Sequence, residues 1–147
     1  MPSITLTVGA AGPVLTAFVA PSLPRQQALT AAGLPLPAAT SGTFLVDSGS
    51  SGTVVDKTLI TPLGLTATGS VMCHTPSTGP QAVPFLQYDV ALIIPGPAPQ
   101  TAWIIEAVAV VESDLSAQGI HGLIGRDLLS RAILVYNGPT NHFSLAY

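Results

Sequence analysis

Proline and glycine interrupt this chain so often that long helices are excluded. Each of the two residues occurs 14 times in 147 positions. Proline breaks helices because it lacks a backbone donor, and glycine permits the sharp turns that connect short strands. The stretches between these residues are apolar and rich in β-branched side chains, which is typical of strands. The sequence therefore predicts a mainly β protein.

Charged residues are scarce and hydrophobic residues abundant. Charged side chains make up 7% of the chain and hydrophobic ones 48%, whereas about one quarter of an ordinary soluble domain is charged. The length fits one domain, residues 1–147, with a core that needs neither disulfide nor metal. A formal net charge of −3 provides no basic surface, so we expect no nucleic-acid partner and no attraction to acidic membranes.

The metal-binding and targeting residue patterns are missing from the sequence. Cys73 is the single cysteine, which excludes an internal disulfide and a cysteine-based zinc cluster. The three histidines have no ligand spacing, so we expect no metal and no cofactor. No signal peptide is visible and no apolar run is long enough to span a membrane. The expected location is cytoplasmic, although the chain could be a fragment of a longer protein.

The most informative stretch is residues 44–55, FLVDSGSSGTVV. Asp47 is its only charged residue and follows a short apolar run that reads as a buried strand. A carboxylate in that place needs hydrogen-bond donors or a shifted pKa. An Asp-Ser-Gly turn in solvent is a common alternative, but such a turn rarely lies between two apolar runs. The pattern indicates a strand that presents Asp47.

The other segments predict further strands and a few short helices. Residues 4–8 and 14–20 suggest an opening hairpin, and 21–42 a surface insertion with one helical turn near 26–32 that Gly33 ends. Asp56 is expected to cap a short helix. The remaining predictions are a hairpin of 66–74 with 83–94, a strand at 101–111, an apolar pair between Gly122 and Gly125 followed by a short helix, and a closing hairpin of 133–136 with 142–147.

Two motifs in this order resemble the retropepsin-like aspartic proteases. Strand-Asp-Ser-Gly-Ser is followed by a hairpin, then by apolar-apolar-Gly-Arg-Asp-Leu-Leu and a closing strand, and 87–94 resembles the strand after the family's flap. The resemblance covers most of the chain from Thr43 onward. It implies a closed β-barrel-like fold with one short C-terminal helix. Because each subunit of the family supplies one catalytic aspartate, it also implies a homodimer.

The resemblance assigns roles to individual residues. Asp47 would be the catalytic acid, Ser48 would link the two active-site turns, and Gly49 would hydrogen-bond the substrate backbone. The substrate-binding residues would be Ser50 and Ser51 together with the tip of a flap hairpin that spans about 70–84, namely Thr75, Pro76, Ser77, Thr78 and Gly79. Support of the Asp47 loop from beneath would come from Leu123, Ile124, Gly125 and Arg126.

The implied activity is that of a dimeric aspartic endopeptidase. Two Asp47 carboxylates, one from each subunit, would share a proton and activate a water. A cleft with few charges would favour extended apolar peptides. We expect Ser50 to donate to Asp47, and a hydroxyl that donates to an ionised carboxylate favours its charged form. The sequence therefore predicts an acidic optimum.

The chain also departs from the family pattern. Viral members place an acid two residues after the motif glycine, where it pairs with the arginine of their Gly-Arg segment, but Ser51 occupies that position here. Arg126 therefore needs another partner, either Asp127 or a carboxylate of the second subunit. The alternative function is a dimeric binding or scaffold module of the same fold that has lost turnover. A β-sandwich unrelated to proteases would leave the paired motifs unexplained.

Overall fold

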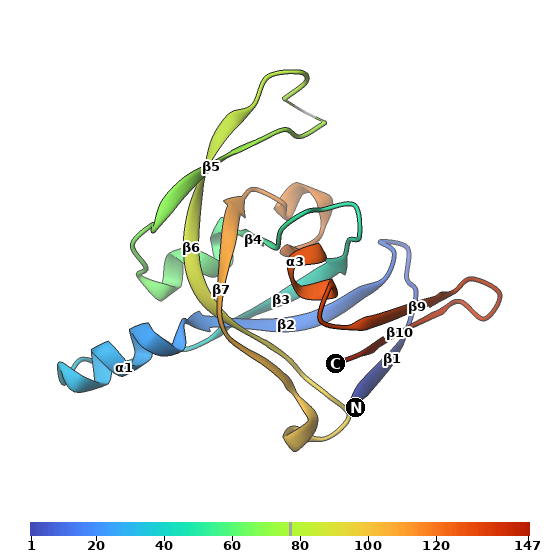
Figure 1. Ribbon diagram of the computed structural model, residues 1–147, viewed down its shortest axis with the longest axis horizontal. Coiled ribbons are helices and arrows are strands. Elements are labelled where there is room, and N and C mark those ends of the chain that lie inside the picture. The colour runs from blue at the N-terminus through green and yellow to red at the C-terminus, as the bar shows by residue number, and fades with distance from the viewer. Residues whose placement is uncertain (77) are drawn as a thin grey trace.

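The computed structural model describes residues 1–76 and 78–147. These residues form a mainly β structure (Figure 1). In chain order the elements are β1 (Ser3–Thr7), β2 (Val14–Pro21), α1 (Leu23–Ala31), β3 (Thr40–Val46), β4 (Val54–Asp56), α2 (Lys57–Ile60), the 3-10 helix η1 (Thr61–Leu63), β5 (Gly69–Cys73), β6 (Val83–Ile94), η2 (Pro99–Thr101), β7 (Trp103–Ser113), η3 (Ser116–Gln118), β8 (Gly122–Ile124), α3 (Arg126–Leu129), β9 (Ile133–Asn137) and β10 (His142–Ala146).

Six strands close into a barrel, as the resemblance implied. Their order is β2-β3-β8-β4-β7-β6, and β6 pairs with β2 to complete the ring. Every second side chain of these strands points inward, so the alternation of apolar residues in the sequence becomes the core. Phe44, Val55, Leu92, Val110 and Ile124 are each fully buried there. The barrel thus packs its interior with side chains and presents its loops at the ends.

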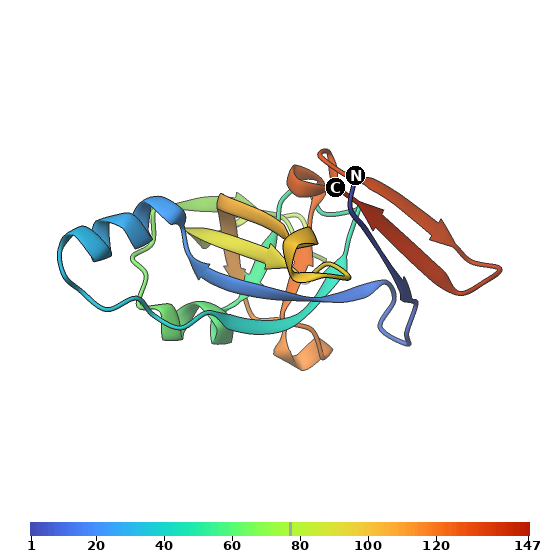
Figure 2. The ribbon, with the colours of Figure 1, turned by 90° about the horizontal axis from the view of Figure 1, so that it is seen from below.

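The hairpin predicted for the first two strands is wrong. β1 pairs with β10 in the register Ser3↔Ala146 to Thr7↔His142, and β10 pairs with β9. Gly9 and Gly12 form an isolated bridge in the turn after β1, and in the described ranges β1 and β2 do not pair with each other. These three strands form a separate sheet at one end of the molecule, next to both chain termini (Figure 2). The closing hairpin of β9 and β10 is confirmed.

The long hairpin predicted from the sequence is confirmed. β5 pairs with the first half of β6 in the register Gly69↔Gln87 to Cys73↔Val83. The second half of β6 belongs to the barrel, so the hairpin rises from the barrel wall (Figure 1). The predicted strand at 101–111 is also confirmed as β7, which pairs with β6.

Three α-helices occur among the described residues, whereas the fold prediction gave one short C-terminal helix. α3 is that helix, and α2 is the short helix predicted after Asp56. α1 has nine residues instead of a single turn, and no side chain on it is buried. Gly33 follows it with a φ of 68°, which is a conformation that favours glycine. No helix in the described ranges is long and apolar enough to cross a membrane.

Asp56 caps α2 as predicted, and its side chain is also fully buried. One carboxylate oxygen accepts hydrogen bonds from the amide and the hydroxyl of Thr58, at 2.8 and 2.7 Å, and the other accepts from the Leu115 amide at 2.6 Å. Burial by itself raises the pKa of Asp56. The hydrogen-bond donors together lower it by more, so the pKa lies below its ordinary value. Asp56 therefore fastens α2 to the loop after β7.

We expect Asp56→Asn to lower the free energy of unfolding by about 1–3 kcal/mol at pH 7, since the new amide would face the Leu115 N–H without accepting from it. A folded-state pKa below the unfolded one stabilises the fold above about pH 4, and this contribution is lost as pH falls through the folded value. The difference between wild type and variant should therefore shrink below pH 4 in urea titrations. The exposed Asp89→Asn serves as control, and a difference that stays constant from pH 7 to 3 would contradict the assignment.

Candidate active site

Asp47 lies directly beyond the last residue of β3. β3 runs parallel to β8 with Phe44↔Gly122 and Val46↔Ile124 in register, and β8 also pairs with β4 on its other side. The Asp47 amide continues this ladder by donating to the Ile124 carbonyl at 3.0 Å. The loop from β3 to β4 therefore passes around the end of β8, and its first residue is fixed by a sheet hydrogen bond.

The Asp47 carboxylate is held by its own turn. Its Oδ1 atom accepts from the Gly49 amide at 2.9 Å, and the Asp47 carbonyl accepts from the Ser50 amide at 3.2 Å. The side chain is half-buried, while Ser48 and Gly49 are exposed. A Cβ on residue 49 would lie 3.0 Å from Asp47 Oδ1, so glycine fits this position best.

Two hydrogen bonds expected from the sequence are not formed. The Ser50 hydroxyl donates to the Gly52 carbonyl at 2.7 Å instead of to Asp47. Ser50 therefore closes its own turn, and the argument for an acidic optimum through its hydroxyl is wrong. Asp127 does not pair with Arg126 either, since both carboxylate oxygens accept hydrogen bonds from Thr53.

Arg126 is tied to the backbone of the Asp47 loop. Its Nη1 atom donates to the Ser48 carbonyl at 2.8 Å, and its amide donates to the Ser50 carbonyl at 2.9 Å. A charge-assisted bond to a carbonyl is stronger than a neutral one. Arg126 thus connects α3 with the two residues on either side of Gly49.

Thr53 joins the end of the same loop to α3, and sequence reasoning missed it. Its amide and hydroxyl donate to the two oxygens of Asp127 at 3.0 and 2.8 Å, and its hydroxyl accepts from the Gly125 amide at 3.2 Å. Thr53 is fully buried. The available signal was a threonine inside an apolar run, which must find partners when it is buried.

His121 also has a structural role that the sequence did not reveal. Its Nδ1 atom accepts from the Thr43 amide at 3.1 Å, its amide donates to the Thr43 carbonyl at 2.7 Å, and its carbonyl accepts from the Asp56 amide. His121 therefore extends the pairing of β8 to both of its neighbours. An acceptor Nδ1 requires the neutral ring with its proton on Nε2.

Two glycines allow β8 and α3 to approach the loop closely. A Cβ on Gly122 would fall within the ring of Phe44, and one on Gly125 would overlap the backbone carbonyl of Gly52. Any larger residue would displace a buried side chain or the loop itself. Together with Leu123 and Ile124, these residues form a floor against the Asp47 loop, and their role as support for a catalytic turn stays a prediction.

The predicted flap residues form a second group at the tip of the β5–β6 hairpin. The Thr75 amide donates to the Thr78 hydroxyl at 2.9 Å, and the Thr78 amide donates to the Thr75 carbonyl at 3.0 Å. Pro76 is exposed, and Gly79 has a φ of 64°. Ser77 lies outside the described residues. Ser51 belongs to the first group, since it is an exposed residue of the Asp47 loop.

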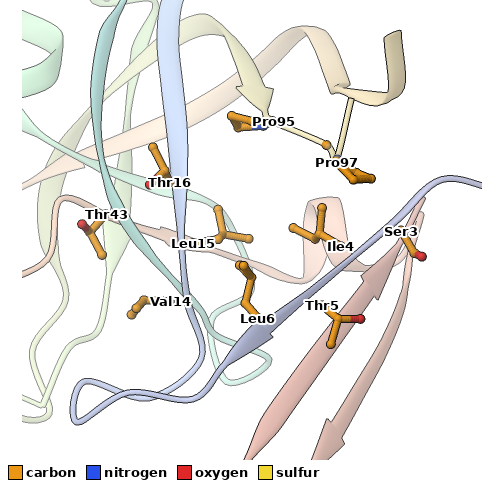
Figure 3. Close-up of a pocket in the computed structure, with 11 residues that line it drawn as sticks. Ser3, Ile4, Thr5, Leu6, Val14, Leu15, Thr16, Thr43, Pro95 and Pro97 are labelled. Atoms are coloured by element: carbon orange, nitrogen blue, oxygen red, sulfur yellow. The ribbon is translucent and has the colours of Figure 1, made fainter. Parts of the chain in front are cut away.

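A separate apolar pocket of about 510 Å³ lies between β1 and β2. Figure 3 shows Ile4, Leu6 and Leu15 pointing into it, with Pro95 and Pro97 along one side. No residue of the Asp47 loop lines this pocket. In the described ranges, no group of three or more His, Cys, Asp or Glu residues could hold a metal ion.

The chain resembles known proteins in structure but not in sequence. No family model matches the sequence, and no curated protein matches it. Among solved structures, the crystal structure of a retropepsin-like aspartic protease from Rickettsia conorii superposes with a TM-score of 0.58 and 17% sequence identity, covering 99% of this chain and 90% of that one. This chain has the retropepsin-like fold. A similarity at 17% identity establishes the fold alone, because proteins of one fold can have different activities.

Proposed function

We propose that the chain is a dimeric aspartic endopeptidase. One observation supports this most directly: within a retropepsin-like fold, the Asp-Ser-Gly turn follows β3 and its carboxylate is oriented by the Gly49 amide above the β8 floor. One chain holds a single such turn. A second copy would provide the other carboxylate, so the proposed active site lies between two chains.

The proposed reaction needs two carboxylates that share one proton. The ionised Asp47 takes a proton from water as the water oxygen attacks the scissile carbonyl carbon, and the protonated Asp47 of the second copy donates to the carbonyl oxygen. Proton transfer to the amide nitrogen then accompanies cleavage of the C–N bond. The pair titrates as a unit. Activity should decline at high pH, because both carboxylates are then ionised and neither can donate a proton. The need for one protonated carboxyl group is the reason for the proposed preference for acidic pH.

Substrate would bind as an extended chain between the Asp47 loop and the hairpin. The Gly49 amide is used by Asp47, which leaves the Gly49 carbonyl to accept a substrate N–H. Ser48 would link the two turns across the dimer, and Ser50 and Ser51 would line the groove. The flap tip, including Ser77, would close over the bound peptide.

The hairpin supports the proposed preference for apolar side chains. Met72 is paired with Pro84, and Met72 and Leu86 are large exposed hydrophobic residues. By alternation, Pro84 and Leu86 lie on the same face of β6 as the buried Tyr88 and Val90. This face is therefore continuous with the barrel interior, so its exposed part offers apolar contacts to a peptide.

A shared site predicts that activity depends on protein concentration. We expect the cleavage rate per chain, measured on proteome-derived peptides between about pH 3 and 7, to rise with concentration and to level off once the chain is dimeric. The dimer fraction should be measured in the same samples by sedimentation. A rate per chain that stays constant while the dimer dissociates would contradict the shared site, and a folded dimer without cleavage would favour the silent binding module.

A further inference from the structure

Arg126 carries a positive charge at the Asp47 loop that no carboxylate in the described chain neutralises. The sequence has only four lysine and arginine residues. In the described ranges the one ion pair joins Lys57 to Asp114, and Arg126 is an exposed residue whose Nη1 bonds the Ser48 carbonyl. A guanidinium has five donors in a planar fork, which suits a carboxylate. The Ser48 bond uses one of them and fixes the side chain against the Asp47 loop.

Most acidic side chains of the chain already have a hydrogen-bond or ion-pair partner. Few carboxylates of a second copy are therefore free to pair with Arg126. Of seven acids, Asp47, Asp56 and Asp127 accept amide hydrogen bonds. Asp114 binds Lys57, and Glu112 lies beside Tyr88, whose pKa is raised by burial and then by the Glu112 charge. The acids that remain are Asp89 and Glu106, and Glu106 lines a small pocket together with Arg131.

We propose that Arg126 binds a carboxylate of the bound polypeptide, so that the site prefers an extended apolar segment with one aspartate or glutamate near the scissile bond. The inference rests on the proposed function. The guanidinium donates to the carbonyl of Ser48, the residue after Asp47, which holds it against the loop that would contact substrate. Position 51 has no acid to neutralise it. A substrate carboxylate would therefore gain a charge-assisted, two-pronged contact.

The test uses peptide twins that differ only in charge. Capped, otherwise uncharged apolar peptides of about eight residues, the length of an extended strand segment, carry glutamate or glutamine at each position in turn. Binding is measured on Asp47→Asn protein and cleavage on protein with Asp47. At one or two positions we expect the glutamate peptide to bind and be cleaved about 10-fold better, the size of one charge-assisted hydrogen bond. The preference should decline as pH falls through about 4.3 and below, because glutamate then becomes protonated.

Arg126→Gln is the matched variant because it removes the positive charge and keeps a polar side chain with an amide donor. In this variant the glutamate and glutamine peptides should bind about equally well. Arg126→Lys should keep part of the preference for glutamate, because it keeps the charge but not the planar fork. Equal binding of both twins at every position would overturn the inference. A weaker dimer with an unchanged preference would also overturn it and assign Arg126 to the subunit contact. An Arg126-dependent binding preference without any cleavage would support the carboxylate site and refute the endopeptidase.

Discussion

Replacing Asp47 by asparagine is expected to lower the rate of peptide cleavage by about 10²–10⁴-fold, the contribution of a positioned acid or base. Asparagine Oδ1 can still accept from the Gly49 amide, which Asp47 Oδ1 binds at 2.9 Å. The loop should therefore keep its shape. The amide can neither take a proton from water nor donate one to the scissile carbonyl as a carboxyl group does. Both copies of the dimer carry the change, so both roles are lost.

The measurement compares cleavage of one peptide by wild type and variant, with folding followed by urea unfolding. Asp89→Asn provides the matched control, since it removes the same charge from an exposed position on β6. It should leave the rate unchanged. Unfolding of the Asp47 variant would identify a structural acid, and cleavage at the wild-type rate would refute the proposed mechanism.

The sequence predicted strands well where pairing is local. Hairpin β5–β6 and hairpin β9–β10 each join neighbouring runs, and alternation and turn residues specify such pairs. The first hairpin was wrong because β1 finds its partner in β10, more than 130 residues later. The propensity of a strand to form contains no information about which distant edge will bind it. The predicted helical turn near 26–32 was shorter than α1 for a different reason, since Pro24 is tolerated in the first turn of a helix.

The contact between the Asp47 loop and the 123–126 segment could be predicted, but the hydrogen bonds there could not. Asp47 and the 123–126 segment meet because β3 and β8 pair in parallel. The resemblance implied that the segment supports the Asp47 loop from beneath, but not this pairing. Which acceptor a hydroxyl finds depends on distances of less than an ångström within the turn. Ser50 donates to the Gly52 carbonyl, whereas we expected it to donate to Asp47. Asp127 accepts from Thr53, whereas we expected it as a possible partner of Arg126.

Gly125→Ala is expected to have the largest effect on stability, lowering the free energy of unfolding by about 1–3 kcal/mol or more. The new Cβ would overlap the Gly52 carbonyl group, which is backbone and cannot rotate away. The Gly125 amide also donates to Thr53, so a shift would disturb the link to Asp127 as well. Because Gly52 belongs to the Asp47 loop, cleavage should fall by about 10²-fold in whatever protein still folds.

Gly52→Ala separates this steric effect from a general effect of replacing glycine in the loop. A Cβ on Gly52 meets no atom within 4 Å, and its φ is not in the left-handed region. Its stability should therefore remain within about 1 kcal/mol of wild type. Equal losses in the two variants, measured by urea unfolding and peptide cleavage, would mean that loop flexibility is what matters. A loss confined to Gly125→Ala would show that the floor formed by β8 and α3 holds Asp47 in place.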